Sequence, residues 1–172
     1  MKRIVLAAAF VLAALPPAGA AVVASGPGGF TVKFEADVAA TPAQAFETFT
    51  KIGNWWSSDH TFSGDAKNMS MDVSPGGAWR ETLPNNGFVE HMRVIHSAPG
   101  AMLVLSGGLG PLQFMGVAGT MTVTFTAKDA GTHVTLEFSG GGYDPDNFAK
   151  WPAAVDGVIG EQFARYSTYA NQ

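Results

Sequence analysis

Strict alternation of apolar and polar side chains is the feature that most constrains the fold of this chain. In residues 30–38 every second side chain is apolar, and the intervening residues are Thr, Lys, Glu and Asp. Residues 120–126 repeat the pattern, with four threonines that alternate with Met, Val and Phe. Successive side chains of a strand point to opposite faces, so both segments predict strands with one buried face. The chain is therefore expected to contain a sheet with one apolar side.

Short turns rich in Pro, Gly and Asn connect further segments of this kind. Connections of this length join antiparallel neighbours, whereas parallel strands need a long crossover. The glycine-rich segment 107–116 is predicted to be a loop on the cavity side or a helical turn. The predicted strands are residues 30–38, 69–73, 78–83, 88–97, 101–106, 120–126 and 133–138.

Two helical regions complete the prediction. Thr41, Pro42 and Gln44 form a capping box with proline at the first helical position, which predicts two short helices up to about Asn54. Residues 148–169 carry an apolar stripe at helical spacing, and about 20 residues at 1.5 Å each make a helix of about 30 Å. This helix is long enough to cross the sheet. We therefore expect an α+β fold in which a curved antiparallel sheet wraps around a long C-terminal helix.

The N-terminus has the pattern of a secretory signal peptide. Lys2 and Arg3 precede an apolar run over residues 4–15, and Ala18-Gly19-Ala20 supplies the small residues of a cleavage site. The alternative is an uncleaved anchor, but the run is shorter than the roughly 20 residues that span a bilayer. We predict cleavage after Ala20 and a periplasmic or secreted protein without a stable membrane anchor.

Composition limits the partners and the domain count. Removing residues 1–20 leaves 172 − 20 = 152 residues, which are predicted to form a flexible lead-in at 21–29 and one domain at 30–172. The remaining charge is (10 − 2) − 14 = −6, and no run of Lys and Arg is present. These features argue against nucleic acid as a partner. The chain has no cysteine, so its stability depends on its core rather than on disulfides.

Three segments together resemble a known family. Trp55-Trp56, the segment Asp72-Val-Ser-Pro-Gly-Gly-Ala-Trp79-Arg80 and the terminal helix are similar to the Hsp90-ATPase-activator-like branch of the START/Bet v 1-like (SRPBCC) superfamily. The resemblance covers residues 30–170 and implies the helix-grip fold, with a cavity between the sheet and the C-terminal helix. Members of the family mostly bind or transform small hydrophobic molecules there. An exported protein does not meet a cytosolic ATP-dependent chaperone, so we do not expect chaperone stimulation.

Glu81 and Glu90 are the candidate catalytic residues. Glu81 shares the phase of Trp79, and Glu90 shares the phase of Met92, so both carboxylates are predicted to face the cavity. Two carboxylates in a water-poor cavity raise each other's pKa, and one of them can then act as an acid or a base. The alternative is that the phase is shifted by one residue, or that both carboxylates reach solvent at the rim.

His91 and Arg93 lie on the opposite phase to Glu90, and the side to which His91 points is left open. His91 and His96 are five residues apart on one strand, so they face different sides and cannot bind one metal together. Arg93 is expected to pair with an acidic side chain on the sheet surface. Zinc spacings, the calcium loop and phosphate-binding motifs are absent from the sequence, so no metal and no cofactor are predicted.

Large apolar and aromatic side chains are the candidate ligand-binding residues. Ordinary core packing is the alternative for each of them, because a binding cavity and a core have the same composition. Tyr166 also carries a hydroxyl that needs a partner if it is buried. The predicted ligand-binding residues are Trp56, Trp79, Met92, Phe114, Met121, Phe163 and Tyr166.

Three functions are compatible with these patterns. The first is an exported binding protein for a small hydrophobic or aromatic molecule. The second is an enzyme of the cyclase or hydrolase type that uses cavity carboxylates. The third is a protein-interaction module that supports folding in the cell envelope, which would require an exposed apolar patch.

Overall fold

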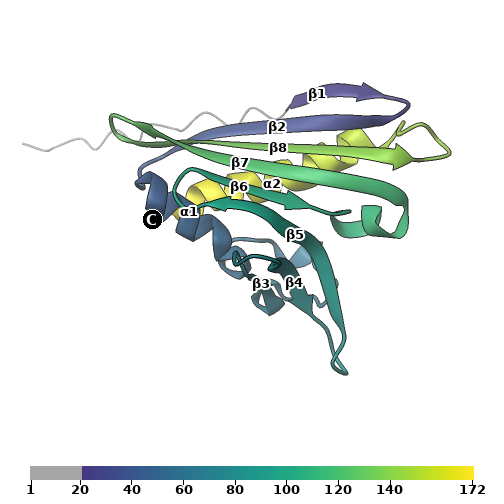
Figure 1. Ribbon diagram of the computed structural model, residues 1–172, viewed down its shortest axis with the longest axis horizontal. Coiled ribbons are helices and arrows are strands. Elements are labelled where there is room, and N and C mark those ends of the chain that lie inside the picture. The colour runs from purple at the N-terminus through teal and green to yellow at the C-terminus, as the bar shows by residue number, and fades with distance from the viewer. Residues whose placement is uncertain (1–20) are drawn as a thin grey trace, which may run out of the picture.

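A computed structural model describes residues 21–172 and has the predicted α+β architecture. Eight antiparallel strands form one sheet in the order β1-β2-β8-β7-β6-β5-β4-β3, and the long helix α2 lies against its concave side (Figure 1). The strands are β1 (Ala21–Gly26), β2 (Gly29–Val38), β3 (Met69–Met71), β4 (Ala78–Thr82), β5 (Phe88–Ala98), β6 (Met102–Ser106), β7 (Gly116–Lys128) and β8 (Gly131–Tyr143). The helices are α1 (Pro42–Thr50), η1 (Ile52–Asn54), η2 (Ser58–His60), η3 (Ala66–Asn68), η4 (Gly110–Phe114) and α2 (Trp151–Ala170).

The apolar faces of the alternating strands pack against α2. Along β2 and β7 the buried residues alternate with more exposed ones, as the two-residue period predicted. Phe34 of β2 packs against Phe163 of α2, with their ring centroids 6.1 Å apart. Figure 1 shows that the sheet bends, so that β3, β4 and β5 turn away from β1, β2 and β8. The predicted helix-grip architecture is confirmed.

The start of α1 has the predicted capping box. The side chain of Gln44 accepts a hydrogen bond from the backbone N–H of Thr41, and the Thr41 hydroxyl accepts one from the backbone N–H of Gln44. Tyr166 of α2 donates its hydroxyl hydrogen bond to the carbonyl oxygen of Ala45 at 3.0 Å, which joins the two helices. Within residues 21–172, neither of these helices nor any shorter one has the length and apolar character needed to cross a membrane.

The N-terminal part differs from the prediction in one respect. Residues 21–26 were expected to be a flexible lead-in, but they form β1 and pair with β2. The Gly26-Pro27-Gly28-Gly29 turn makes a hairpin, so the free edge of β2 gains backbone partners. The predicted signal peptide, residues 1–20, lies outside the described residues.

The last strand is longer than the predicted residues 133–138, because the glycines at residues 140–142 continue β8. They pair with Gly29 and Phe30 of β2 on one side and with β7 on the other. A Cβ atom at Gly140 would lie 3.1 Å from the ring of Phe30, so the absence of a side chain lets that ring pack over the strand. Partners on both sides keep this glycine-rich segment extended.

Candidate functional site

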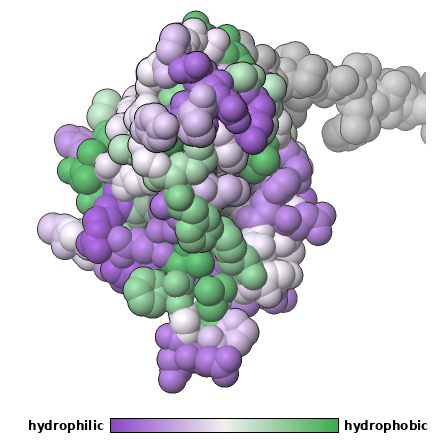
Figure 2. Space-filling model, turned by 90° about the vertical axis from the view of Figure 1, so that its right-hand side faces the viewer, coloured by the Kyte–Doolittle hydropathy of each residue, from purple (hydrophilic) through white to green (hydrophobic). Residues whose placement is uncertain are grey.

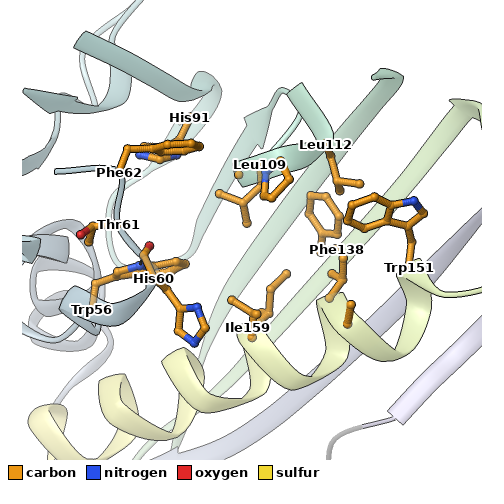
Figure 3. A pocket seen from close by; sticks show the side chains of 15 residues that line it. Trp56, His60, Thr61, Phe62, His91, Leu109, Leu112, Phe138, Trp151 and Ile159 are labelled. Atoms are coloured by element: carbon orange, nitrogen blue, oxygen red, sulfur yellow. Dashed lines mark hydrogen bonds between the residues drawn. The ribbon is translucent and has the colours of Figure 1, made fainter. Parts of the chain in front are cut away.

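A cavity of about 320 Å³ lies between α2 and the curved sheet (Figure 3). Trp56 and residues 60–62 border one end of it, and Trp151 borders the other. Its wall is mostly apolar, and His60, Thr61 and His91 supply its polar side chains. This is the place where the family resemblance predicted a cavity.

The N-terminal half of α2 forms one wall of the cavity. Trp151, Val155, Val158 and Ile159 lie on one face because they are three or four residues apart, and Ala154 lies between them. In Figure 3 the Ile159 side chain points from the helix toward the space below Leu109 and Phe138. The C-terminal half continues the same stripe with Gln162, Phe163 and Tyr166, but these side chains are buried in the core.

Hydrogen bonds hold the segment around η2 against α2. The backbone N–H of Ser57 donates to Gln162 Oε1 at 2.7 Å, and Trp56 Nε1–H donates to the carbonyl oxygen of His60 at 2.9 Å. His60 Nε2 and Glu161 Oε2 are 3.1 Å apart. These contacts fix the position of the aromatic side chains at this end of the cavity.

The glycine-rich segment between β6 and β7 forms the upper wall. Leu109, Pro111 and Leu112 border the cavity, which agrees with the predicted loop or helical turn on the cavity side. Phe114, at the end of η4, points away and is 77% exposed. Its ring packs edge to face with that of Phe62, with a centroid distance of 6.1 Å. Figure 2 shows a band of apolar surface on the side of the molecule where η4 lies.

A buried carboxylate and imidazole form the polar part of the site. Glu81 of β4 is fully buried and His91 of β5 is 3% exposed, and Glu81 Oε2 lies 3.1 Å from His91 Nε2. The backbone N–H groups of Phe62 and Ser63 also donate to the Glu81 carboxylate, the first at 3.2 Å. The His91 ring lies near the rings of Trp79 and Phe62, at centroid distances of 5.1 Å and 6.0 Å.

The surroundings of this pair determine its charge. Burial alone would raise the pKa of Glu81, but hydrogen bonds from Ser63, Phe62 and His91 together hold the pKa below its ordinary value. Burial lowers the pKa of His91, and the neighbouring Glu81 only partly opposes this effect. At neutral pH the pair is therefore a carboxylate and a neutral imidazole. Glu81 accepts from Nε2–H, so Nδ1 carries the free lone pair.

Glu90 does not join Glu81 in the cavity. A β-bulge shifts the register, so that Trp79 pairs with Met92 but Arg80 pairs with Glu90, and His91 is the extra residue between them. Both His91 and Met92 are consequently buried, and the predicted inward phase of Glu90 is corrected. Glu90 accepts hydrogen bonds from Arg80 at 3.1 Å and lies 2.8 Å from Arg93 Nε on the other face of the sheet. The expectation that Arg93 pairs with a surface acid is confirmed.

One of the seven predicted ligand-binding residues, Trp56, borders the cavity. Phe114 is exposed, as described above, because η4 turns Leu112 rather than Phe114 inward. The remaining five are buried in the core between the bent sheet and the C-terminal half of α2: Trp79, Met92, Met121, Phe163 and Tyr166. Trp79 lies next to the site, since its ring packs edge to face on Trp56 with a centroid distance of 4.7 Å.

Sequence reasoning left several cavity residues out of the predicted set. Phe62 and Thr61 stand in a polar segment without periodicity, so no pattern indicated their role. Trp151, Val155 and Val158 carried a clear signal, because they belong to the predicted helical stripe. In the described part of the chain, no three His, Asp or Glu side chains are grouped closely enough to hold a metal ion.

Comparison with known proteins identifies the family of the domain. The family model described as Activator of Hsp90 ATPase homolog 1-like protein matches residues 39–157. No curated protein sequence matches the chain.

Solved structures with low sequence identity share the fold. A protein from Chromobacterium violaceum has 12% identity and a TM-score of 0.59, and the alignment covers 83% of this chain and 97% of that one. A protein from Rhodobacter sphaeroides has 18% identity and a TM-score of 0.56, with 88% and 97% covered. An uncharacterized protein from Rhizobium leguminosarum has 20% identity and a TM-score of 0.53, with 78% and 93% covered.

Proposed function

The chain belongs to the Activator of Hsp90 ATPase homolog 1-like family, and from this premise we propose that it is an exported protein that binds a small hydrophobic or aromatic molecule. The observation that carries the proposal is the apolar cavity of about 320 Å³ between α2 and the sheet. Small-molecule sites commonly have volumes of about 300–1,000 Å³ and mostly apolar walls. The chaperone named in the family description is not part of the proposal, because the N-terminal sequence favours export.

Aromatic side chains around the cavity support an aromatic or similarly flat ligand. Trp56, Phe62, Phe138 and Trp151 all border it, and stacked or edge-to-face contacts between rings add to the effect of burial. The same side chains make binding measurable, because two of them are tryptophans. A ligand beside Trp56 or Trp151 should change the intrinsic fluorescence of the protein.

Two neighbouring alanines of α2 allow a matched test. Both are exposed, but Ala154 borders the cavity and Ala153 does not. Ala154→Phe should fill part of the cavity and weaken binding by tenfold or more, and Ala153→Phe should leave binding unchanged. Binding would be measured with a panel of lipids and aromatic metabolites, by tryptophan fluorescence and by melting temperature.

The size of the thermal effect follows from mass action. A ligand at about 100 times its Kd should stabilise the folded protein by about 2.7 kcal/mol. A panel that leaves both fluorescence and melting temperature unchanged would refute the binding function, as would equal effects of the two phenylalanine variants.

Export is a separate part of the proposal with its own test. The mature protein recovered from the native host is expected to begin at Ala21, and mass spectrometry of the intact chain would show this directly. An intact N-terminus that begins at Met1, together with recovery from the cytoplasm, would contradict export.

The Glu81–His91 pair favours an enzyme as the second candidate function. A carboxylate that holds an imidazole in one tautomer is a common arrangement for a general base. Such an enzyme should convert a bound ligand, and Glu81→Gln should lower the rate even when the protein is saturated with ligand. Ligands that are recovered unchanged after long incubation with the protein would rule this candidate out for those ligands.

A further inference from the structure

His91 carries an unused hydrogen-bond acceptor at the cavity. Its side chain borders the cavity and is only 3% exposed. Nε2 is occupied by Glu81, and Nδ1 has no hydrogen-bond partner among residues 21–172. A buried polar atom without a partner costs about 1–3 kcal/mol, so proteins keep few of them without a reason.

A second buried atom without a partner lies nearby. Trp79 Nε1 is a donor that has no acceptor within the described chain, and the Trp79 ring centroid is 5.1 Å from that of His91. A hydroxyl group can donate a hydrogen bond to an unpaired acceptor such as Nδ1, and its oxygen can still accept one from another donor. A ligand carboxylate fits less well, because the ionised Glu81 would repel a second negative charge in this water-poor place.

We propose that the cavity selects apolar molecules that carry one hydroxyl group, and that this hydroxyl donates its hydrogen bond to Nδ1 of His91. Glu81 acts as a positioning residue, because its carboxylate accepts from Nε2–H and so fixes the tautomer in which Nδ1 is an acceptor. The hydrocarbon part of the ligand lies among the apolar side chains of α2 and η4. This inference rests on the proposed binding function and names the class of ligand.

The test compares three probes with the same two-ring skeleton: naphthalene, 2-naphthol and 2-naphthoate. The unmodified protein should bind 2-naphthol about tenfold more tightly than naphthalene, which corresponds to one hydrogen bond to a group that is otherwise unsatisfied. It should bind 2-naphthoate more weakly than 2-naphthol. Binding would be measured by calorimetry.

His91→Gln removes the imidazole ring that fixes the acceptor Nδ1. The Gln amide can still donate to Glu81 through its NH₂ group, but no ring holds its oxygen at the position of Nδ1, so the preference for 2-naphthol over naphthalene should fall. The affinity for naphthalene should stay the same, which checks that the cavity is intact. His96→Gln is the matched control, because His96 is exposed on the same strand and does not border the cavity.

A spectroscopic measurement separates recognition from a structural role. In protein labelled with ¹⁵N-histidine, the Nδ1 resonance of His91 should shift on addition of 2-naphthol and not of naphthalene. Equal affinity for 2-naphthol and naphthalene, with no shift at Nδ1, would overturn the hydroxyl inference alone. Failure of both probes to bind would overturn the proposed binding function as well.

Discussion

Removal of the buried carboxylate of Glu81 should destabilise the protein far more than removal of the surface carboxylate of Glu90. Glu81 accepts hydrogen bonds from the backbone N–H groups of Phe62 and Ser63 and lies 3.1 Å from His91 Nε2. Glu81→Ala leaves one buried donor, His91 Nε2–H, and two partly buried backbone N–H groups without an acceptor. A buried unsatisfied donor costs about 1–3 kcal/mol, and a partly buried one costs less. Relief of the cost of burying the charge offsets part of this loss, so we expect a net loss of about 3–5 kcal/mol.

The matched variant Glu90→Ala sets the scale. Glu90 pairs with Arg80 and Arg93 at the sheet surface, where ion pairs contribute about 0–1 kcal/mol. Urea denaturation of both variants measures the difference in their free energies of unfolding. The comparison is matched, because each variant replaces a glutamate with alanine and the two positions lie on neighbouring strands. A typical domain has a free energy of unfolding of about 5–15 kcal/mol, so the Glu81 variant should lose a large share of it. Equal losses within about 1 kcal/mol would refute the argument that the donors depend on Glu81.

Glu81→Gln distinguishes charge from hydrogen bonding. If the amide oxygen takes the place of Oε1, it still accepts from the Ser63 N–H. The NH₂ group then takes the place of Oε2 and faces both the Phe62 N–H and Nε2–H of His91, unless the imidazole changes tautomer. We expect that change, with a smaller loss of stability than in Glu81→Ala. The ¹⁵N resonances of His91 would then show Nδ1–H in place of Nε2–H. An unchanged tautomer in this variant would contradict the role of Glu81 as the residue that orients the imidazole.

Further predictions concern pH and backbone. Burial lowers the pKa of His91 below its ordinary value of 6.5, so the unfolded chain binds protons more readily than the folded one below about pH 6.5. The melting temperature should therefore fall in that range, and less steeply in His91→Gln. The pKa of Glu81 is also lowered, which adds a second fall below about pH 4.5. Gly157→Ala should stabilise α2 by about 0.5–1 kcal/mol, since its Cβ meets nothing within 4 Å. Gly119→Ala should destabilise by about 1–3 kcal/mol in the same denaturation assay, because its Cβ would lie 2.7 Å from the ring of Phe138. Thr41→Ala should cost about 1 kcal/mol through loss of the cap of α1.

The parts of the fold that depend on local pattern could be predicted from the sequence. The alternation in residues 30–38 and 120–126 lies within β2 and β7, and the capping box at Thr41 begins α1. Glu81 could also be placed correctly, because β4 is regular between Trp79 and Glu81 and both side chains point inward. In each case a period of two residues, or a cap at a fixed spacing, is sufficient.

The site itself depended on features that have no local pattern. One extra residue in β5 turns His91 inward and Glu90 outward, and nothing near Phe88 or Val94 in the sequence indicates a bulge there. The stripe of α2 predicted which face is buried but not which half borders the cavity. That division depends on how the sheet bends away from the N-terminal half of α2, which is a property of the whole sheet.

The hydrogen bonds of the Glu81 carboxylate link the order of the cavity wall to the chemistry of the site. A buried carboxylate stays ionised only if enough donors surround it, and here two of the donors are the backbone N–H groups of Phe62 and Ser63. Phe62 borders the cavity and packs near His91, so the contacts that stabilise the charge also position one wall of the site. A ligand that binds between Phe62 and α2 must therefore favour the state in which Glu81 is ionised. Protonation of Glu81 on acidification should loosen the segment around Phe62 and Ser63. By linkage, ligand affinity should weaken over the same pH range, even for a ligand that has no titratable group of its own.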